Sequence, residues 1–184
     1  MAEPIADRYR SLLEAASFAA RAHRNQVRKD KVTPYFAHPF RVCLIVRHVF
    51  GIDDPALLTT ALLHDTMEDT TTDFDDVAGT FGASVAGWVA ALSKDKRLPD
   101  GEREAAYMAT LAAAEPAVKI AKLADIFDNL TDSAHLPAAG RQRSIDRSRH
   151  YLAALALHLP EQVRRPFELV SQLLEEVAQA TEAE

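Results

Sequence analysis

Apolar residues recur along this chain at helical spacing, and the strict alternation typical of strands is almost absent. The first apolar stripe, from Leu12 to Ala22, predicts a helix over about residues 8–24. Further stripes, separated by Gly, Pro and Asp, predict helices up to about residue 180. The pattern therefore predicts an all-α fold, a single-domain helical bundle over residues 1–184, with a core over about residues 8–160 and a C-terminal helix over about residues 161–180.

One predicted helix carries an unusual set of polar residues at its end. It begins at Pro55 and is expected to continue through ALLTTALLHDTMED. On a continuous helix, Glu68 lies four residues after His64 and Asp69 lies four residues after Asp65, so these side chains share one side. Carboxylates this close together need a nearby cation.

Composition and charge narrow the possible partners. The chain is 48% apolar and 26% charged, which is typical of a soluble globular protein. Its net charge of −6 disfavours broad binding to a nucleic acid polymer or an anionic membrane. No segment approaches the ~20 apolar residues of a membrane span. The single cysteine, Cys43, is expected to be a small buried hydrophobe, and the lack of an intrachain disulfide suits the cytoplasm.

Side chains able to bind a metal occur at three separate places where helix packing favours apolar residues. They are His38, the adjacent pair His64-Asp65, and Asp125. Imidazole and carboxylate ligands suit a divalent transition ion such as Mn²⁺, Fe²⁺ or Zn²⁺. Without a partner, the buried pair would cost several kcal/mol of desolvation, and a bound cation removes that objection.

Each of these features has an ordinary explanation when it is taken alone. His38 fits a structural histidine, Asp125 a helix-surface acid, and Glu68 with Asp69 a solvated helix end. The order His, His-Asp, Asp on separate helices is far more specific. It favours a metal site over a purely structural helical bundle.

Four stretches of the sequence resemble a known family. They are AARAHRNQVRKDKVTPYFAHPFRV, ALLHDTMEDTTTDFDDVAGTFGASV, SKDKRLPDGER and VKIAKLADIFDNL, which together span about residues 15–130. They resemble the hydrolase domain of the RelA/SpoT homologues, within the HD superfamily of metal-dependent phosphohydrolases, and are most similar to the small alarmone hydrolases. The resemblance implies a bundle of the HD-domain type that hydrolyses the 3′-pyrophosphate of (p)ppGpp-like nucleotides, giving GDP or GTP and pyrophosphate.

The resemblance also implies roles for individual residues. Those matching the family's ligands to one Mn²⁺ ion, or to another divalent transition metal, are His38, His64, Asp65 and Asp125. Glu68 and Asp69 match the acidic pair that positions and activates the attacking water. Arg28 and Lys29 match residues that pack around the nucleobase of a small-molecule nucleotide, Asn129 matches a residue that contacts the nucleoside, and Lys96 falls in the loop that meets phosphates. Arg147 and Tyr151 are expected to complete the pocket.

The chain departs from the family pattern beside Asp125. It reads ADIFDN where the family often has ADRLHN or ADKLYN, so Ile126 replaces a basic residue and Asp128 replaces His or Tyr. Because these positions are expected to adjoin the nucleoside, base specificity stays open. Alternatives are an adenine alarmone, NADPH as substrate, or a non-catalytic nucleotide-binding module, and the intact ligand set argues against the last. The sequence leaves the oligomeric state open.

Overall fold

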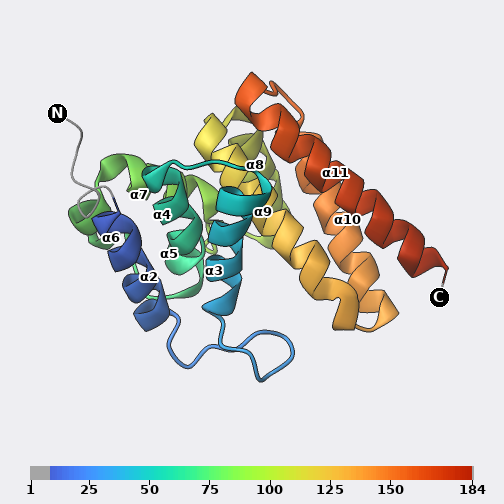
Figure 1. Ribbon diagram of the computed structural model, residues 1–184, viewed down its shortest axis with the longest axis horizontal. Helices are drawn as coiled ribbons and strands as arrows, with labels where there is room; N and C mark the ends of the chain where they lie inside the picture. Colours follow the sequence, from blue (N-terminus) through green and yellow to red (C-terminus); the bar gives the residue numbers. More distant parts are fainter. Residues whose placement is uncertain (1–8, 184) are drawn as a thin grey trace.

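Helices form the architecture of this chain in the computed structural model, which describes residues 9–183 (Figure 1). The α-helices are α2 (Arg10–Ala22), α3 (Ala37–Leu44), α4 (Pro55–Leu63), α5 (Thr66–Asp69), α6 (Phe74–Phe81), α7 (Ala83–Leu92), α8 (Asp100–Ala113), α9 (Pro116–Thr131), α10 (Ala138–Leu155) and α11 (Glu161–Glu182). A π-helical turn, Ile45–Val49, extends α3, and a 3₁₀ turn, Asp132–His135, follows α9. Within residues 9–183 the only strand-like feature is an isolated bridge between Val27 and Pro34. The predicted all-α fold is confirmed.

Three helices meet at the centre of the molecule and position the candidate site. Helix α3 packs against both α4 and α9, and α4 also contacts α9. Helices α2 and α7 cover α4 on one side, whereas α10 and α11 pack against α9 on the other (Figure 1). Two apolar clusters form the core, one mainly between α3, α9, α10 and α11 and the other between α2, α4 and α7. The polar residues of α3, α4 and α9 are therefore brought together inside an apolar frame.

The expected continuous helix through Asp69 is wrong, because α4 ends at Leu63 and α5 begins at Thr66. Side-chain donors compete for the last carbonyls of α4. Thr66 Oγ1 donates to the Leu63 carbonyl at 2.7 Å, and His64 Nδ1 donates to the Ala61 carbonyl at 2.9 Å. Such side-chain bonds to the backbone disfavour a regular helix and leave His64 and Asp65 in a turn.

Local signals in the sequence fix the start of α4. Asp54 caps α4, since its Oδ1 accepts from the backbone N–H of Ala56 at 2.9 Å, and Pro55 occupies the first turn. Gly51, before this cap, has φ of 73°, a left-handed conformation that glycine adopts without strain.

Cys43, the single cysteine of the sequence, lies on α3. The Cys43 side chain is half-buried and packs against both apolar clusters, so it is less enclosed than the sequence suggested. Burial raises the pKa of its thiol to about 11. In the described part of the chain, every helix is too short or too polar to cross a bilayer.

Candidate active site

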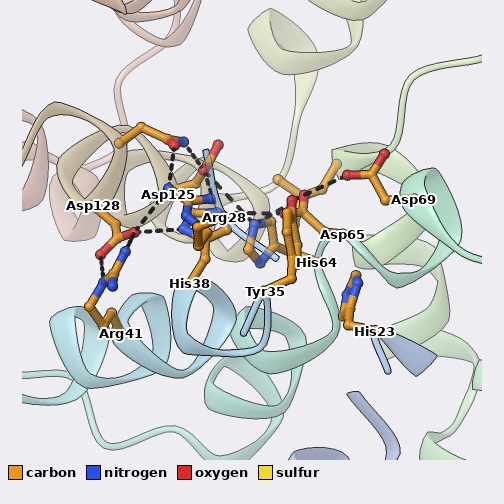
Figure 2. Close-up of polar contacts among 12 residues, drawn as sticks. His23, Arg28, Tyr35, His38, Arg41, His64, Asp65, Asp69, Asp125 and Asp128 are labelled. Carbon is orange, nitrogen blue, oxygen red and sulfur yellow. Dashed lines mark hydrogen bonds and ion pairs between the residues drawn. The ribbon is translucent and has the colours of Figure 1, made fainter. Parts of the chain in front are cut away.

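The four predicted metal ligands converge between α3, the turn after α4, and α9 (Figure 2). His38 Nε2 lies 3.2 Å from Asp125 Oδ1 and 3.5 Å from Asp65 Oδ2. His64 Nε2 lies 3.1 Å from Asp65 Oδ1 and 3.9 Å from Asp125 Oδ1. Three of these side chains are buried, and Asp65 is partly exposed toward the cavity.

The donor atoms fit a divalent cation. Each imidazole uses its Nδ1 elsewhere, His64 on the Ala61 carbonyl at 2.9 Å and His38 on Asp128 Oδ2 at 2.6 Å, so both Nε2 atoms face the carboxylates. His64 Nε2 is buried and has no hydrogen-bond partner among the described residues. One ligand atom from each of His38, His64 and Asp65 lies within 4.8 Å of the others. Neutral imidazole nitrogens and carboxylate oxygens grouped this closely are a typical transition-metal site.

Lys122 is a cationic side chain in direct contact with this cluster. Its Nζ donates to Asp125 Oδ2 at 2.7 Å and lies 4.3 Å from the centre of the Tyr151 ring. Burial alone raises the pKa of Asp125, but the charges of Lys122 and His38 hold it well below its usual range. Burial alone lowers the pKa of His38, but hydrogen bonds to Asp125 and Asp128 raise it to about 9. Sequence reasoning gave Lys122 no role, although its place three residues before Asp125 on one predicted helix was a signal.

Glu68 and Asp69 lie beside the cluster on α5. Glu68 Oε2 accepts from the backbone N–H of Lys94 at 2.9 Å. Asp69 Oδ1 accepts from Lys96 Nζ at 2.8 Å, and the Glu68 carbonyl accepts from the same ammonium. Burial raises the pKa of Glu68, and the negative charges of Asp65 and Asp69 raise it further. The hydrogen bond from the Lys94 backbone N–H acts in the opposite direction but does not cancel the shift. A carboxyl group with a raised pKa is suited to exchange protons near neutral pH.

Tyr35 links the acidic pair to the predicted metal ligands, a role that sequence reasoning missed. Its hydroxyl lies 2.7 Å from Asp65 Oδ2 and 3.2 Å from Asp69 Oδ2, close enough to donate to either (Figure 2). Its ring lies 4.7 Å from that of His23, centre to centre. The one available signal was its place in PYFAHP, three residues before His38.

A cavity of about 600 Å³ opens beside the cluster. His38, His64, Asp65, Glu68 and Asp125 all contribute to its wall. The predicted substrate contacts that line it are Arg28, Lys29, Asn129, Arg147 and Tyr151. Lys96 does not line it, because its ammonium is bound to α5, and Lys94 of the same loop lines it instead. The volume is sufficient for a nucleotide-sized ligand.

Several cationic groups contribute to the lining of this cavity. Lys94 Nζ donates to the Tyr151 hydroxyl at 2.7 Å and stays in the lining. Burial, with the nearby charges of Arg147 and Arg28, lowers the pKa of Lys29. Clustered ammonium and guanidinium groups are suited to a polyphosphate.

The two departures from the family pattern have different surroundings. Ile126 is buried and lines the cavity, as expected for a residue near the nucleoside. Asp128 was expected to adjoin the nucleoside as well, but its carboxylate binds side chains of α3. Its Oδ2 accepts from His38 Nδ1, on the side of the imidazole away from the cluster, and its Oδ1 accepts from Arg41 Nε at 2.6 Å. It does not contribute to the described cavity wall, because Arg41 on α3 pairs with it behind His38.

Arg28, expected near the nucleobase, is held by the segment after α9. Its Nε and Nη2 donate to Asp132 Oδ2 at 3.1 and 2.6 Å, and Nη2 also donates to Asn129 Oδ1 at 3.3 Å. Asn129 Nδ2 in turn donates to Asp125 Oδ1 at 2.5 Å. Hydrogen bonds therefore connect this wall of the cavity to the metal-binding cluster.

A helical bundle that holds two imidazoles and two carboxylates between its central helices is typical of the HD-type metal-dependent hydrolases. The HD domain family matches residues 15–160, and the chain belongs to that family. Its divalent metal has a fitting set of ligand atoms in His38, His64 and Asp65.

More particular similarities connect the chain to alarmone hydrolases. It is 48% identical over 122 residues to guanosine-3′,5′-bis(diphosphate) 3′-pyrophosphohydrolase MESH1 of Homo sapiens, covering 66% of this chain and 68% of that protein. It is 33% identical to GTP pyrophosphokinase of Streptomyces coelicolor over 154 residues, which are 82% of this chain and 18% of that one. A solved structure described as "A metazoan ortholog of SpoT hydrolyzes ppGpp and plays a role in starvation responses" superposes with a TM-score of 0.79, at 29% identity and 98% coverage of both chains. The resemblance stated from the sequence motifs is confirmed.

Proposed function

We propose that this protein hydrolyses the 3′-pyrophosphate bond of (p)ppGpp-like alarmones, giving GDP or GTP and pyrophosphate. The observation that carries the proposal is the convergence of His38, His64, Asp65 and Asp125 beside Glu68, at the wall of a cavity lined with cationic side chains. The 48% identity to a human enzyme named for this reaction supports the same conclusion.

The metal in this proposal is Mn²⁺, held by His38, His64, Asp65 and Asp125. When bound, a divalent cation supplies Lewis-acid polarisation of a phosphoryl oxygen and lowers the pKa of water. The ligands support a bound divalent cation, because His64 Nε2 has no hydrogen-bond partner among the described residues and the neighbouring Asp65 Oδ1 requires a positive partner. Mn²⁺ is the ion that the resemblance implies. The rest of the chemistry belongs to the protein side chains.

Glu68 is the proposed proton acceptor for the attacking water. Burial raises the pKa of its carboxyl group, and the Lys94 backbone N–H fixes Oε2, so that Oε1 remains to take the proton. Asp69 orients the water and is itself held by Lys96 and Tyr35. Water attacks the phosphorus next to the ribose 3′ oxygen. The bond from that phosphorus to the 3′ oxygen breaks, and the 3′ oxygen takes up a proton from solvent to become the 3′ hydroxyl of GDP or GTP. The attacked phosphorus keeps the water oxygen and is released as part of pyrophosphate.

The cavity wall supplies the proposed contacts to the small-molecule nucleotide. Lys94, Arg147 and Tyr151 bind phosphates, because they contribute cationic or hydroxyl donors to the cavity lining. Arg28 and Lys29 pack around the nucleobase, and Asn129 contacts the nucleoside. Lys96, also predicted from the sequence, is assigned instead to holding Asp69 in place.

Product analysis tests this function directly. Pure protein is incubated with Mn²⁺ and either ppGpp, ppApp or NADPH, and the products are separated chromatographically. Pyrophosphate released from ppGpp is the expected result. Turnover of ppApp alone would assign an adenine alarmone, and orthophosphate from NADPH alone would assign a phosphomonoester. No turnover of any of the three would leave a nucleotide-binding module and refute the proposal.

Two substitutions separate the metal from the proton acceptor. Asp65→Ala is expected to abolish both Mn²⁺ binding and turnover. Glu68→Gln should keep Mn²⁺ binding but slow turnover at least about a hundredfold, which is the size of general acid–base effects. Glu176→Gln, on the exposed face of α11, is the matched control and should leave both unchanged. Full activity in either of the first two variants would contradict the assigned roles.

A further inference from the structure

Asp128 makes contacts that the proposed chemistry does not use. It is 3% exposed and lies on α9, behind the His38 ring (Figure 2). Its Oδ2 accepts from His38 Nδ1 at 2.6 Å and from Arg41 Nη2 at 3.0 Å, while its Oδ1 accepts from Arg41 Nε at 2.6 Å. Arg28 Nη2 also lies 3.9 Å from Oδ2, so this buried carboxylate contacts one imidazole nitrogen and two guanidinium groups, of which Arg41 is the closer.

We propose that Asp128 is a positioning residue that orients His38 for the metal and strengthens it as a ligand. The inference rests on the metal site of the proposed function. A proton on Nδ1 that is donated to Asp128 leaves the lone pair of His38 on Nε2. That nitrogen faces Asp125 Oδ1 and Asp65 Oδ2, at 3.2 and 3.5 Å. A carboxylate behind a ligating imidazole fixes its tautomer and raises its basicity.

Arg41 stabilises the buried carboxylate of Asp128. An unpaired charge at 3% exposure would carry a large desolvation cost, and the paired contact from Arg41 offsets it. Arg41 lies one helical turn after His38 on α3, so one helix presents both groups to Asp128. The His or Tyr that the family often has at this position carries no full negative charge at neutral pH. The carboxylate is thus a feature of this chain's own sequence.

The second imidazole shows the contrast. His64 Nδ1 donates to the Ala61 carbonyl, a neutral acceptor, at 2.9 Å. Hydrogen bonds to an ionised acceptor are roughly twice as strong as those between neutral groups. His38 therefore depends on a partner side chain in a way that His64 does not, and substituting Asp128 should weaken metal binding through His38.

The test compares Mn²⁺ affinity in three variants of the full chain. Asp128→Ala removes the acceptor, and Asp128→Asn keeps an amide oxygen for His38 but removes the charge. Asp132→Asn is the matched control, because Asp132 pairs with Arg41 at 3.1 Å and with Arg28 but does not contact His38. Free Mn²⁺ is followed by its electron paramagnetic resonance signal during titration, and circular dichroism verifies the fold of each metal-free variant.

We expect Asp128→Ala to weaken Mn²⁺ binding about 10–100-fold, the usual effect of removing a group that supports a metal ligand. Asp128→Asn should lose less, but at least about threefold, because a neutral acceptor is the weaker one. Asp132→Asn should stay within about twofold of the unsubstituted chain, as for a group without contact to a ligand.

Three results would overturn the inference. One is unchanged affinity in Asp128→Ala, and another is an equal loss in Asp132→Asn, which would trace the effect to the arginine pairs. If Asp128→Ala does not fold, unchanged affinity in Asp128→Asn is the third. Failure of the unsubstituted chain to bind Mn²⁺ would instead refute the metal site itself, so the two failures are distinguishable.

Discussion

Lys122→Met is the substitution with the largest expected effect on the metal-free protein. Lys122 is 8% exposed, and its Nζ donates to Asp125 Oδ2 at 2.7 Å. Burial alone lowers the pKa of Lys122, but the charge of Asp125 raises it well above its ordinary value, so the ammonium is charged in the folded protein. Methionine keeps the side-chain length and leaves Asp125 buried without this cation. Removing one partner of a buried ion pair costs about 3–5 kcal/mol.

This cost translates into a measurable change in thermal stability. For a chain of this size, each kcal/mol shifts Tm by about 2–4 °C, so the loss should be roughly 6–20 °C. The assay is far-UV circular dichroism during heating in the presence of a chelator. Saturating Mn²⁺ should then narrow the gap between variant and unsubstituted chain, since a bound cation also neutralises Asp125.

Lys96→Met is the matched control for this measurement. The Lys96 side chain is 55% exposed, and its Nζ lies 2.8 Å from Asp69 Oδ1. An exposed ion pair contributes at most about 1 kcal/mol, so Tm should fall by only a few degrees. If Lys122→Met loses no more stability than Lys96→Met in chelator, the reasoning about the buried pair is refuted.

Three further predictions concern a helix cap, the thiol and the cavity wall. Asp54→Ala should lower the unfolding free energy by about 1 kcal/mol in chemical denaturation, because it removes the cap of α4, and an unchanged midpoint would contradict this. Cys43 should react slowly with iodoacetamide in the folded protein at mildly alkaline pH. A rise in thiol pKa from 9.0 to about 11 lowers the thiolate fraction about a hundredfold, and labelling at the rate of the unfolded chain would show otherwise. Arg147→Ala should raise KM more than it lowers kcat in steady-state kinetics if Arg147 binds phosphate at the wall, and a pure kcat loss would contradict that.

The fold and the residues of the cluster were predictable because both rest on repeated or local signals. The helical spacing of apolar residues indicated an all-α bundle, and histidines and acids in apolar stretches indicated where a metal would lie. The break after α4 was not predictable from spacing. It depends on His64 and Thr66 donating to backbone carbonyls, an alternative that competes with a continuing helix.

Contacts between distant parts of the chain account for most of the remaining differences. The resemblance placed Asp128 beside the nucleoside, yet its carboxylate is held by Arg41, 87 residues earlier. Tyr35 and Lys122 were given no role, although each contacts a predicted ligand directly. The pair of Asp128 and Arg41 arises when α3 packs against α9, and Tyr35 reaches Asp65 across 30 residues of sequence. Lys122 is different, because it bonds to Asp125 three residues later on the same helix.

The distribution of cations around the acids explains where a metal is needed. Lys122 pairs with Asp125, Arg41 with Asp128, and Lys96 with Asp69. Asp65 differs from these three aspartates. Within residues 9–183 its described partners are Tyr35, His38 and His64, and none of them is a lysine or an arginine. When these histidines are neutral and serve as ligands, Asp65 has no positive neighbour in direct contact. The attraction that draws a divalent cation into the cluster is therefore concentrated at the aspartate of the HD pair, and the other three aspartates are already paired with a lysine or arginine of the chain.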